Sequence, residues 1–205
     1  MGGSDNKQRL LIEYSHKIAH KHLVMGAMGN ISLREPGRGP RTTRSARVRD
    51  REVAWIKRSG AWLEKAKPGD FLRVNIAHPE HKIARKISKE INLHLGCLRA
   101  RPDINAVIHT HPKVSTGLAT AGIDLGRKMA KIRPKIGLKV VSIKYYQPGS
   151  KALAKTVQNA IKKADAVLMA DHGLVTVGKS LKEAYQNTLK IEVNASKLVR
   201  RALNG

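Results

Sequence analysis

The stretch "AVIHTHP", residues 106–112, sets two histidines one residue apart at the end of an apolar run. We expect a strand over residues 104–111, in which side chains alternate between the two faces of the sheet. His109 and His111 then share a face, and Thr110 lies on the other. Two such imidazoles can bind one ion, at Zn–N distances of about 2.0–2.1 Å. The pair equally fits two hydrogen-bonded histidines at a strand edge, and its spacing leaves both interpretations open.

A third ligand would favour the metal. His172, in "MADHGLV", follows an apolar run and precedes Gly173, where the backbone can turn sharply or approach a ligand closely. Catalytic zinc sites typically have three protein ligands and one open position. Because 61 positions separate His172 from His111, nothing local shows that the two meet.

A candidate base precedes the histidine pair. Glu90 and His94 share one face of a helix that we expect from about Ile83 to Arg99. Glu90 is an acid in a very basic chain and is a candidate proton carrier. The alternative is a solvated partner for Lys86 or Lys89, and the spacing does not decide between these roles.

Further along the chain, hydrophobic periodicity predicts alternating helices and strands, which indicates a layered α/β domain. Expected helices cover residues 6–25, 112–122, 149–164 and 180–203, the last two opened by Ser150 and Ser180 as N-caps. Further strands are expected at 28–34, 52–56, 71–76, 138–146 and, with a break at "DHG", within 165–178. Residues 35–51 are rich in Gly, Pro and Arg and are predicted to form an exposed basic loop.

Composition narrows the class of protein. A chain of 205 residues usually forms one domain, here residues 1–205. It has no apolar run of about 18 residues, so no membrane span is expected. The single Cys97 fits a reducing, cytoplasmic setting. The net charge of +25 makes nucleic acid a possible partner. We favour solvated lysine-rich faces instead, because the charge is spread along the chain and only 3% of residues are aromatic.

Five segments carry a family resemblance through their motifs and their order along the chain. They are "GNISLR" (29–34), "RSGAWLEKAKPGDFLRV" (58–74), "SKEINLHLGCLRARPDINAVIHTHP" (88–112), "GSKALAKTV" (149–157) and "ADHGLVTVGKSLKEAY" (170–185). Together they resemble the class II aldolase/adducin family, in particular its fuculose-phosphate aldolase type. The resemblance runs from about Gly26 into the last helix. It implies a three-layer αβα sandwich around a central, largely antiparallel mixed sheet.

The resemblance also implies the roles of individual residues. His109, His111 and His172 would bind a divalent metal, most often Zn²⁺, and Glu90 would be the catalytic carboxylate. The family's phosphate pocket falls on two turns and on the residues before the acid. These are Gly29, Asn30, Ser59, Gly60, Ser88 and Lys89.

The activity implied is cleavage of a short ketose phosphate, similar to fuculose 1-phosphate, into dihydroxyacetone phosphate and an aldehyde. The metal would stabilise an enediolate, and Glu90 would act as acid and base. A cytoplasmic homotetramer is implied as well. The alternatives are a pentulose-phosphate 4-epimerase, a sugar-phosphate dehydratase, and a non-catalytic adducin-like or polyanion-binding protein. Related epimerases typically have Asp at the position of Glu90, which favours carbon–carbon cleavage.

Two departures from the family pattern concern the substrate pocket. The aldolases tend to have a Pro-Ser-Ser-Glu run where this chain has Ile87-Ser88-Lys89-Glu90. They also place a functional tyrosine after the HxH strand, whereas residues 117–138 contain none. Tyr145 and Tyr146 are the candidates to replace it.

Overall fold

A computed structural model describes residues 3–35, 52–80, 86–131 and 137–204. Its centre is a seven-stranded sheet in the order β3-β2-β1-β4-β7-β6-β5. Only β5 and β6 pair in parallel, and every other neighbouring pair is antiparallel. The strands are β1 (Asn30–Glu35), β2 (Val53–Lys57), β3 (Phe71–Asn75), β4 (Ala106–Thr110), β5 (Val140–Ile143), β6 (Ala166–Met169) and β7 (Gly173–Gly178). The predicted mixed, largely antiparallel sheet is confirmed.

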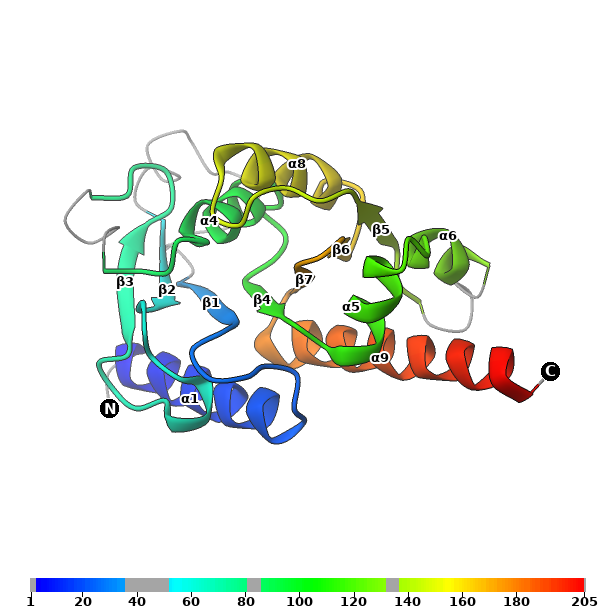
Figure 1. Ribbon diagram of the computed structural model, residues 1–205. Coiled ribbons are helices and arrows are strands. Elements are labelled where there is room, and N and C mark those ends of the chain that lie inside the picture. The colour runs from blue at the N-terminus through cyan, green and yellow to red at the C-terminus, as the bar shows by residue number, and fades with distance from the viewer. Residues whose placement is uncertain (1–2, 36–51, 81–85, 132–136, 205) are drawn as a thin grey trace.

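Helices cover both faces of this sheet, as Figure 1 shows. One layer contains α4 (Ile91–Ala100) and α8 (Lys151–Ile161), and the other contains α1 (Gly3–His20), α5 (Lys113–Thr120) and α9 (Leu181–Asn204). The short helices η2 (Leu63–Lys65) and α6 (Leu125–Ala130) pack beside α1 and β5. The three-layer αβα architecture is therefore confirmed. Within the described ranges, no helix is both long and apolar enough to cross a membrane.

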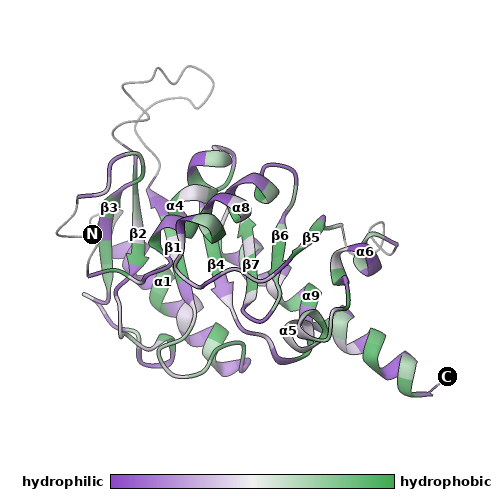
Figure 2. Cartoon of the chain, turned by 45° about the horizontal axis from the view of Figure 1, so that its top comes forward, coloured by the Kyte–Doolittle hydropathy of each residue, from purple (hydrophilic) through white to green (hydrophobic). Residues whose placement is uncertain are grey.

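The central strand β4 is buried on both faces, which explains its continuous apolar run. Ala106 and Ile108 belong to the hydrophobic cluster beneath α1 and α9, whereas Val107 packs in the cluster beneath α4 and α8. Apolar strands accordingly lie between the helical layers in Figure 2. Because side chains alternate, His109 faces the same layer as Val107, which is the layer that contains α4.

Antiparallel pairing brings distant parts of the chain to one edge of the sheet. Asn30, the first residue of β1, pairs with His109 near the end of β4, and Thr110 pairs with Leu174 at the start of β7. The last residue of β2, Lys57, lies at this same edge, because Ser32 pairs with Ile56. Polar residues at these strand ends therefore surround a common space.

Two helix boundaries differ from the prediction. The first helix ends at His20 rather than at residue 25, because His22 takes a left-handed backbone with φ of 54° and donates its N–H to Ala19. The predicted helix from Ile83 begins only at Ile91, with Glu90 as its N-cap residue. Ile87 instead forms an antiparallel bridge with Arg58. Only the start of this helix was mispredicted, because Glu90 still accepts the N–H of His94 in the first turn of α4.

Most other elements lie close to their predicted positions. Ser150 and Ser180 accept hydrogen bonds from Leu153 and Glu183, as expected of N-caps. The strand predicted over 138–146 is shorter, and helix α6 was not predicted. Of the predicted loop at 35–51, Glu35 ends β1 and residues 36–51 lie outside the described residues.

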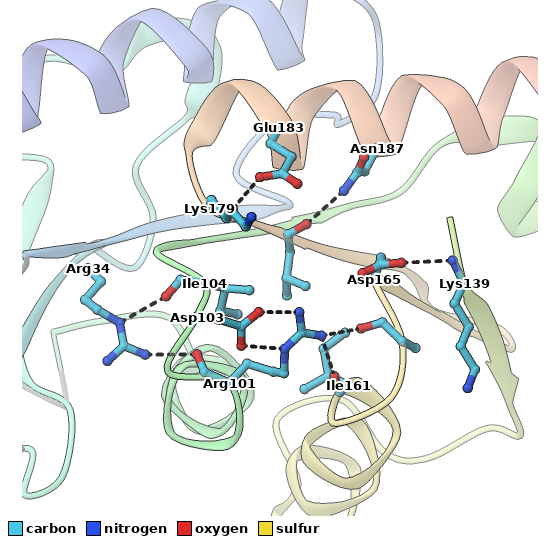
Figure 3. A network of polar contacts seen from close by, with 12 residues as sticks. Arg34, Arg101, Asp103, Ile104, Lys139, Ile161, Asp165, Lys179, Glu183 and Asn187 are labelled. Atoms are coloured by element: carbon cyan, nitrogen blue, oxygen red, sulfur yellow. Dashed lines mark hydrogen bonds and ion pairs between the residues drawn. The ribbon is translucent and has the colours of Figure 1, made fainter. Parts of the chain in front are cut away.

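At the opposite ends of strands β1 and β4, two arginines make networks of polar contacts, shown in Figure 3. Arg101, which follows α4, holds both carboxylate oxygens of Asp103 at 2.7 and 2.6 Å. It also donates to the carbonyls of Ile161, the last residue of α8, and of Ala164 just after it. Arg34 on β1 donates to the carbonyl of Ile104 at 3.1 Å and pairs with Glu52. The bonds of Arg101 thus join the end of α4 to α8, and Arg34, which also donates to the carbonyl of Leu98, joins α4 to β1, away from the histidine pair.

Candidate metal centre

Three histidines meet at the polar edge of the sheet. The ring centroids of His109 and His111 are 4.6 Å apart, and the ring of His172 lies 4.9 Å from the first and 5.8 Å from the second. One ring nitrogen of each lies within 4.8 Å of those of the other two. Among the described residues, no other group of three His, Cys, Asp or Glu side chains converges in this way. The pair at the end of β4 is therefore not isolated, and metal binding by the three histidines stays a prediction.

Gly173 allows this approach. A Cβ atom at residue 173 would lie 2.4 Å from the carbonyl oxygen of Thr110 and 2.6 Å from the ring of His111. The preceding Asp171 takes a left-handed backbone with φ of 54°, which reverses the chain between β6 and β7. The glycine is thus required by the close packing of β7 on β4, and this packing brings His172 beside the pair.

The donor set fits a divalent metal. Burial lowers the pKa of all three imidazoles, that of His111 to about 4, so each is neutral near pH 7. The Nδ1 atom of His109 lies 3.2 Å from the carbonyl oxygen of Leu174, so this nitrogen carries the proton and Nε2 keeps a lone pair. In the described part of the chain, the buried Nδ1 atoms of His111 and His172 have no hydrogen-bond partner. Neutral nitrogen ligands of this kind suit Zn²⁺ and similar ions.

Glu90 lies directly beside the histidines. Its side chain is buried, and Oε1 accepts the N–H of Gly149 at 2.8 Å and lies 3.9 Å from Nε2 of His172. Oε2 has no partner within the described ranges. Burial raises the pKa of Glu90, and the Gly149 bond partly opposes this shift. The alternative of a solvated partner for a lysine is therefore wrong, and a buried carboxyl of this kind suits proton transfer.

A cavity of about 570 Å³ opens onto the histidines and Glu90. The residues predicted as metal ligands, catalytic acid and phosphate pocket all line it: Gly29, Asn30, Ser59, Gly60, Ser88, Lys89, Glu90, His109, His111 and His172. Gly29 and Gly60 both take a left-handed backbone, and a Cβ at residue 29 would lie 2.4 Å from Val24. The phosphate-binding roles of these residues stay predictions, but their side chains and turns face one space.

Lys57 also lines the cavity and was missed in the sequence. The side chain is fully buried, and its ammonium donates to the carbonyls of Ala27 at 2.9 Å and Ala61 at 2.5 Å. Burial lowers its pKa to about 8. A lysine that ends an apolar strand directly before "RSG" was the available signal. Tyr145 and Tyr146, in contrast, do not line the cavity, and the first is half exposed.

Comparisons with known proteins agree with this geometry. The model of the class II aldolase and adducin N-terminal domain matches residues 9–198. An L-fuculose phosphate aldolase of Methanocaldococcus jannaschii is 31% identical over 190 residues, covering 92% of this chain and 91% of that protein. A 3-oxo-tetronate 4-phosphate decarboxylase of Escherichia coli is 28% identical over 178 residues, covering 83% and 75%. A solved L-fuculose 1-phosphate aldolase superposes with a TM-score of 0.79 at 28% identity, covering 100% and 90%.

Proposed function

The chain belongs to the class II aldolase and adducin family, and from this premise we propose that it is a divalent-metal-dependent lyase. Its proposed substrate is a short ketose phosphate similar to fuculose 1-phosphate, which it would cleave into dihydroxyacetone phosphate and an aldehyde. The observation that carries the proposal is the buried Glu90 carboxylate, 3.9 Å from one of three convergent histidines.

The three histidines would hold the ion, for which Zn²⁺ is the first candidate. When bound, the ion supplies Lewis-acid stabilisation of the negative charge that develops on the substrate as the bond breaks. Three neutral ligands leave its charge of +2 undiminished. His109, whose Nδ1 donates to the carbonyl of Leu174, would offer Nε2 as its ligand atom.

Glu90 would carry the proton. Gly149 fixes Oε1, which leaves Oε2 free to face the substrate. A raised pKa brings a carboxyl closer to the working pH, where it both accepts and returns a proton efficiently.

The substrate phosphate would be bound across the cavity by Gly29, Asn30, Ser59, Gly60, Ser88 and Lys89. Exposed N–H groups at such turns suit a phosphate dianion. The ammonium of Lys57 has three N–H donors and uses two on carbonyls, so one is left for an anion. Holding the phosphate would orient the reacting carbons at the histidines.

A second candidate is decarboxylation of a 3-oxo sugar-acid phosphate, favoured by the similarity to the Escherichia coli decarboxylase. Both reactions break a carbon–carbon bond next to a carbonyl and leave similar charge behind. An epimerase or dehydratase on the same scaffold would break a different bond.

A panel of phosphorylated pentuloses, hexuloses and 3-oxo acids separates these reactions. We expect dihydroxyacetone phosphate from fuculose 1-phosphate or a close analogue. Release of carbon dioxide, or accumulation of an epimer without cleavage, would replace the aldolase assignment. If the purified protein contains no divalent metal and binds none with micromolar affinity, all of these enzymatic assignments fail together. The homotetramer and the cytoplasmic location stay predictions, the first of which light scattering can check.

A further inference from the structure

A second hollow lies between helices α1 and α9, in the layer that does not contain α4. Its volume is about 620 Å³, and none of its lining residues belongs to the metal cavity. The lining is Tyr14, His16, Lys17, His20, Lys21, Lys182, Tyr185, Gln186 and Leu189, and we call it the α1–α9 groove.

The α1–α9 groove is positive and lacks any acidic lining residue. Lys17 pairs with Glu13 at 2.5 Å. Lys21 and Lys182 are exposed, and no carboxylate of the described ranges lies within 4.0 Å of either ammonium. His20 is exposed at the same groove and adds a further polar ring, whereas Nε2 of His16 lies 3.1 Å from the carbonyl oxygen of Ala66. Two uncompensated ammonium groups beside one hollow attract an anionic ligand.

Aromatic rings are concentrated in the same place. The chain has four tyrosines, and two of them, Tyr14 and Tyr185, line the groove with ring centroids 5.8 Å apart. Tyr185 is only half-buried, so part of its ring is open to a ligand. Aromatic faces beside cationic side chains are the combination that binds unpaired bases and their phosphates.

We propose that the α1–α9 groove binds single-stranded nucleic acid, with Lys21 and Lys182 at phosphates and Tyr185 against a base, and we take RNA as the first probe. A polymer gains from the net charge of +25 as well as from the groove. A single small anion gains little from distant charges, which salt screens beyond about 10 Å. We interpreted the positive charge from the sequence as solvated faces. The proposal gives part of that charge a ligand at this groove, and it does not depend on the proposed lyase activity.

The test is fluorescence anisotropy of a labelled oligouridylate over a range of salt concentrations. The test variant is the double substitution Lys21→Gln/Lys182→Gln. The matched control is Lys155→Gln/Lys162→Gln on and just after α8, which removes the same charge from exposed positions in the opposite helical layer. Both variants should fold and keep their metal, because all four side chains are exposed.

Each phosphate contact on a single strand contributes about 0.7 to the slope of log K against log salt. The test variant should therefore lose about 1.4 of slope and bind roughly 25-fold more weakly near 0.1 M salt. The control should change affinity by less than about threefold. An equal loss in the control, or no RNA binding by the natural chain, overturns the proposal.

The base contact is tested separately. Tyr185→Leu should weaken RNA binding about tenfold and leave heparin binding unchanged, since heparin offers charge without bases. Tyr185→Phe keeps the ring and should restore RNA binding, which guards against a folding defect. If Tyr185→Leu weakens heparin and RNA equally, the stacking role is wrong.

Discussion

The two ends of β4 satisfy their polar groups in different ways. At the N-terminal end, Arg34 and Arg101 direct their donors to carboxylates and backbone carbonyls (Figure 3). At the C-terminal end, buried nitrogens of His111 and His172 and one oxygen of Glu90 have no partner among the described residues. A buried polar atom left unpaired costs about 1–3 kcal/mol.

This contrast distinguishes a structural hydrogen-bond network from a candidate binding site. Bonds that are complete within the chain stabilise the fold and need no ligand. A cluster of buried polar atoms without hydrogen-bond partners costs stability until a ligand binds to these atoms. Substitutions at the two ends of β4 should therefore separate stability from activity.

Removal of the metal should have the largest effect. Dialysis against a chelator is expected to lower lyase activity by at least about 10⁴-fold, because the developing charge loses its stabilisation. Added Zn²⁺ should restore the natural chain but not a His172→Ala variant. His20→Ala, an exposed histidine on α1, is the control and should keep its metal. Full activity of the metal-free protein would contradict the assignment.

Glu90→Gln should have the next largest effect and lower kcat by a factor of between about 10² and 10⁴. The amide keeps the size of the side chain and a carbonyl oxygen for the N–H of Gly149, so metal content and thermal stability should change little. Steady-state kinetics and metal analysis of one preparation check both. Unchanged kcat would exclude Glu90 as the proton carrier.

Gly173→Ala should damage both stability and binding. The added methyl would meet Thr110 and His111 at distances that require β7 to move. We expect a loss of about 1–3 kcal/mol in the free energy of unfolding and a weaker metal affinity. In Gly117→Ala, on α5, the new Cβ has no neighbour within 4 Å. This control should gain about 0.5–1 kcal/mol in the free energy of unfolding. Denaturant titration of both variants measures the difference.

Arg101→Met tests the hydrogen-bond network at the N-terminal end of β4. Losing the bonds to Asp103, Ile161 and Ala164 should cost about 1–2 kcal/mol of stability, since the pair is partly exposed. Metal affinity and kcat should remain within about twofold of the natural values. A marked loss of metal would show that the two ends are coupled.

Acid should weaken the metal-free fold gradually. Burial lowers the pKa of His94 to about 3 and that of His111 to about 4, with His109 and His172 lowered as well. As pH falls below about 6.5, the unfolded chain therefore binds more protons than the folded one, and stability falls. Each histidine contributes up to about 1.4 kcal/mol per pH unit, and the raised pKa of Glu90 opposes one of them. Melting temperatures that stay level from pH 6.5 to 4 would contradict this.

Local patterns account for what the sequence predicted well. The alternation along β4 placed His109 and His111 on one face, and the serines at 150 and 180 marked helix starts. The meeting with His172 required the five-segment resemblance, because 61 residues intervene. The start of α4 was mispredicted since Ile87 pairs with Arg58, a contact between distant segments. Lys57 was missed because a strand-end lysine usually points to solvent, whereas this one is buried against two carbonyls.

The close packing of β7 on β4 has a consequence for how the metal and the fold depend on each other. An unfolded chain keeps His109 and His111 as neighbours, but bringing His172 to them requires closing a loop of about 60 residues at an entropic cost. The three-ligand site exists only while β7 is docked. Metal should therefore bind the native state far more tightly than the unfolded chain, and saturating metal should raise the melting temperature. Detachment of β7 from β4 would separate His172 from the other two histidines, so loss of a bound metal would report that detachment.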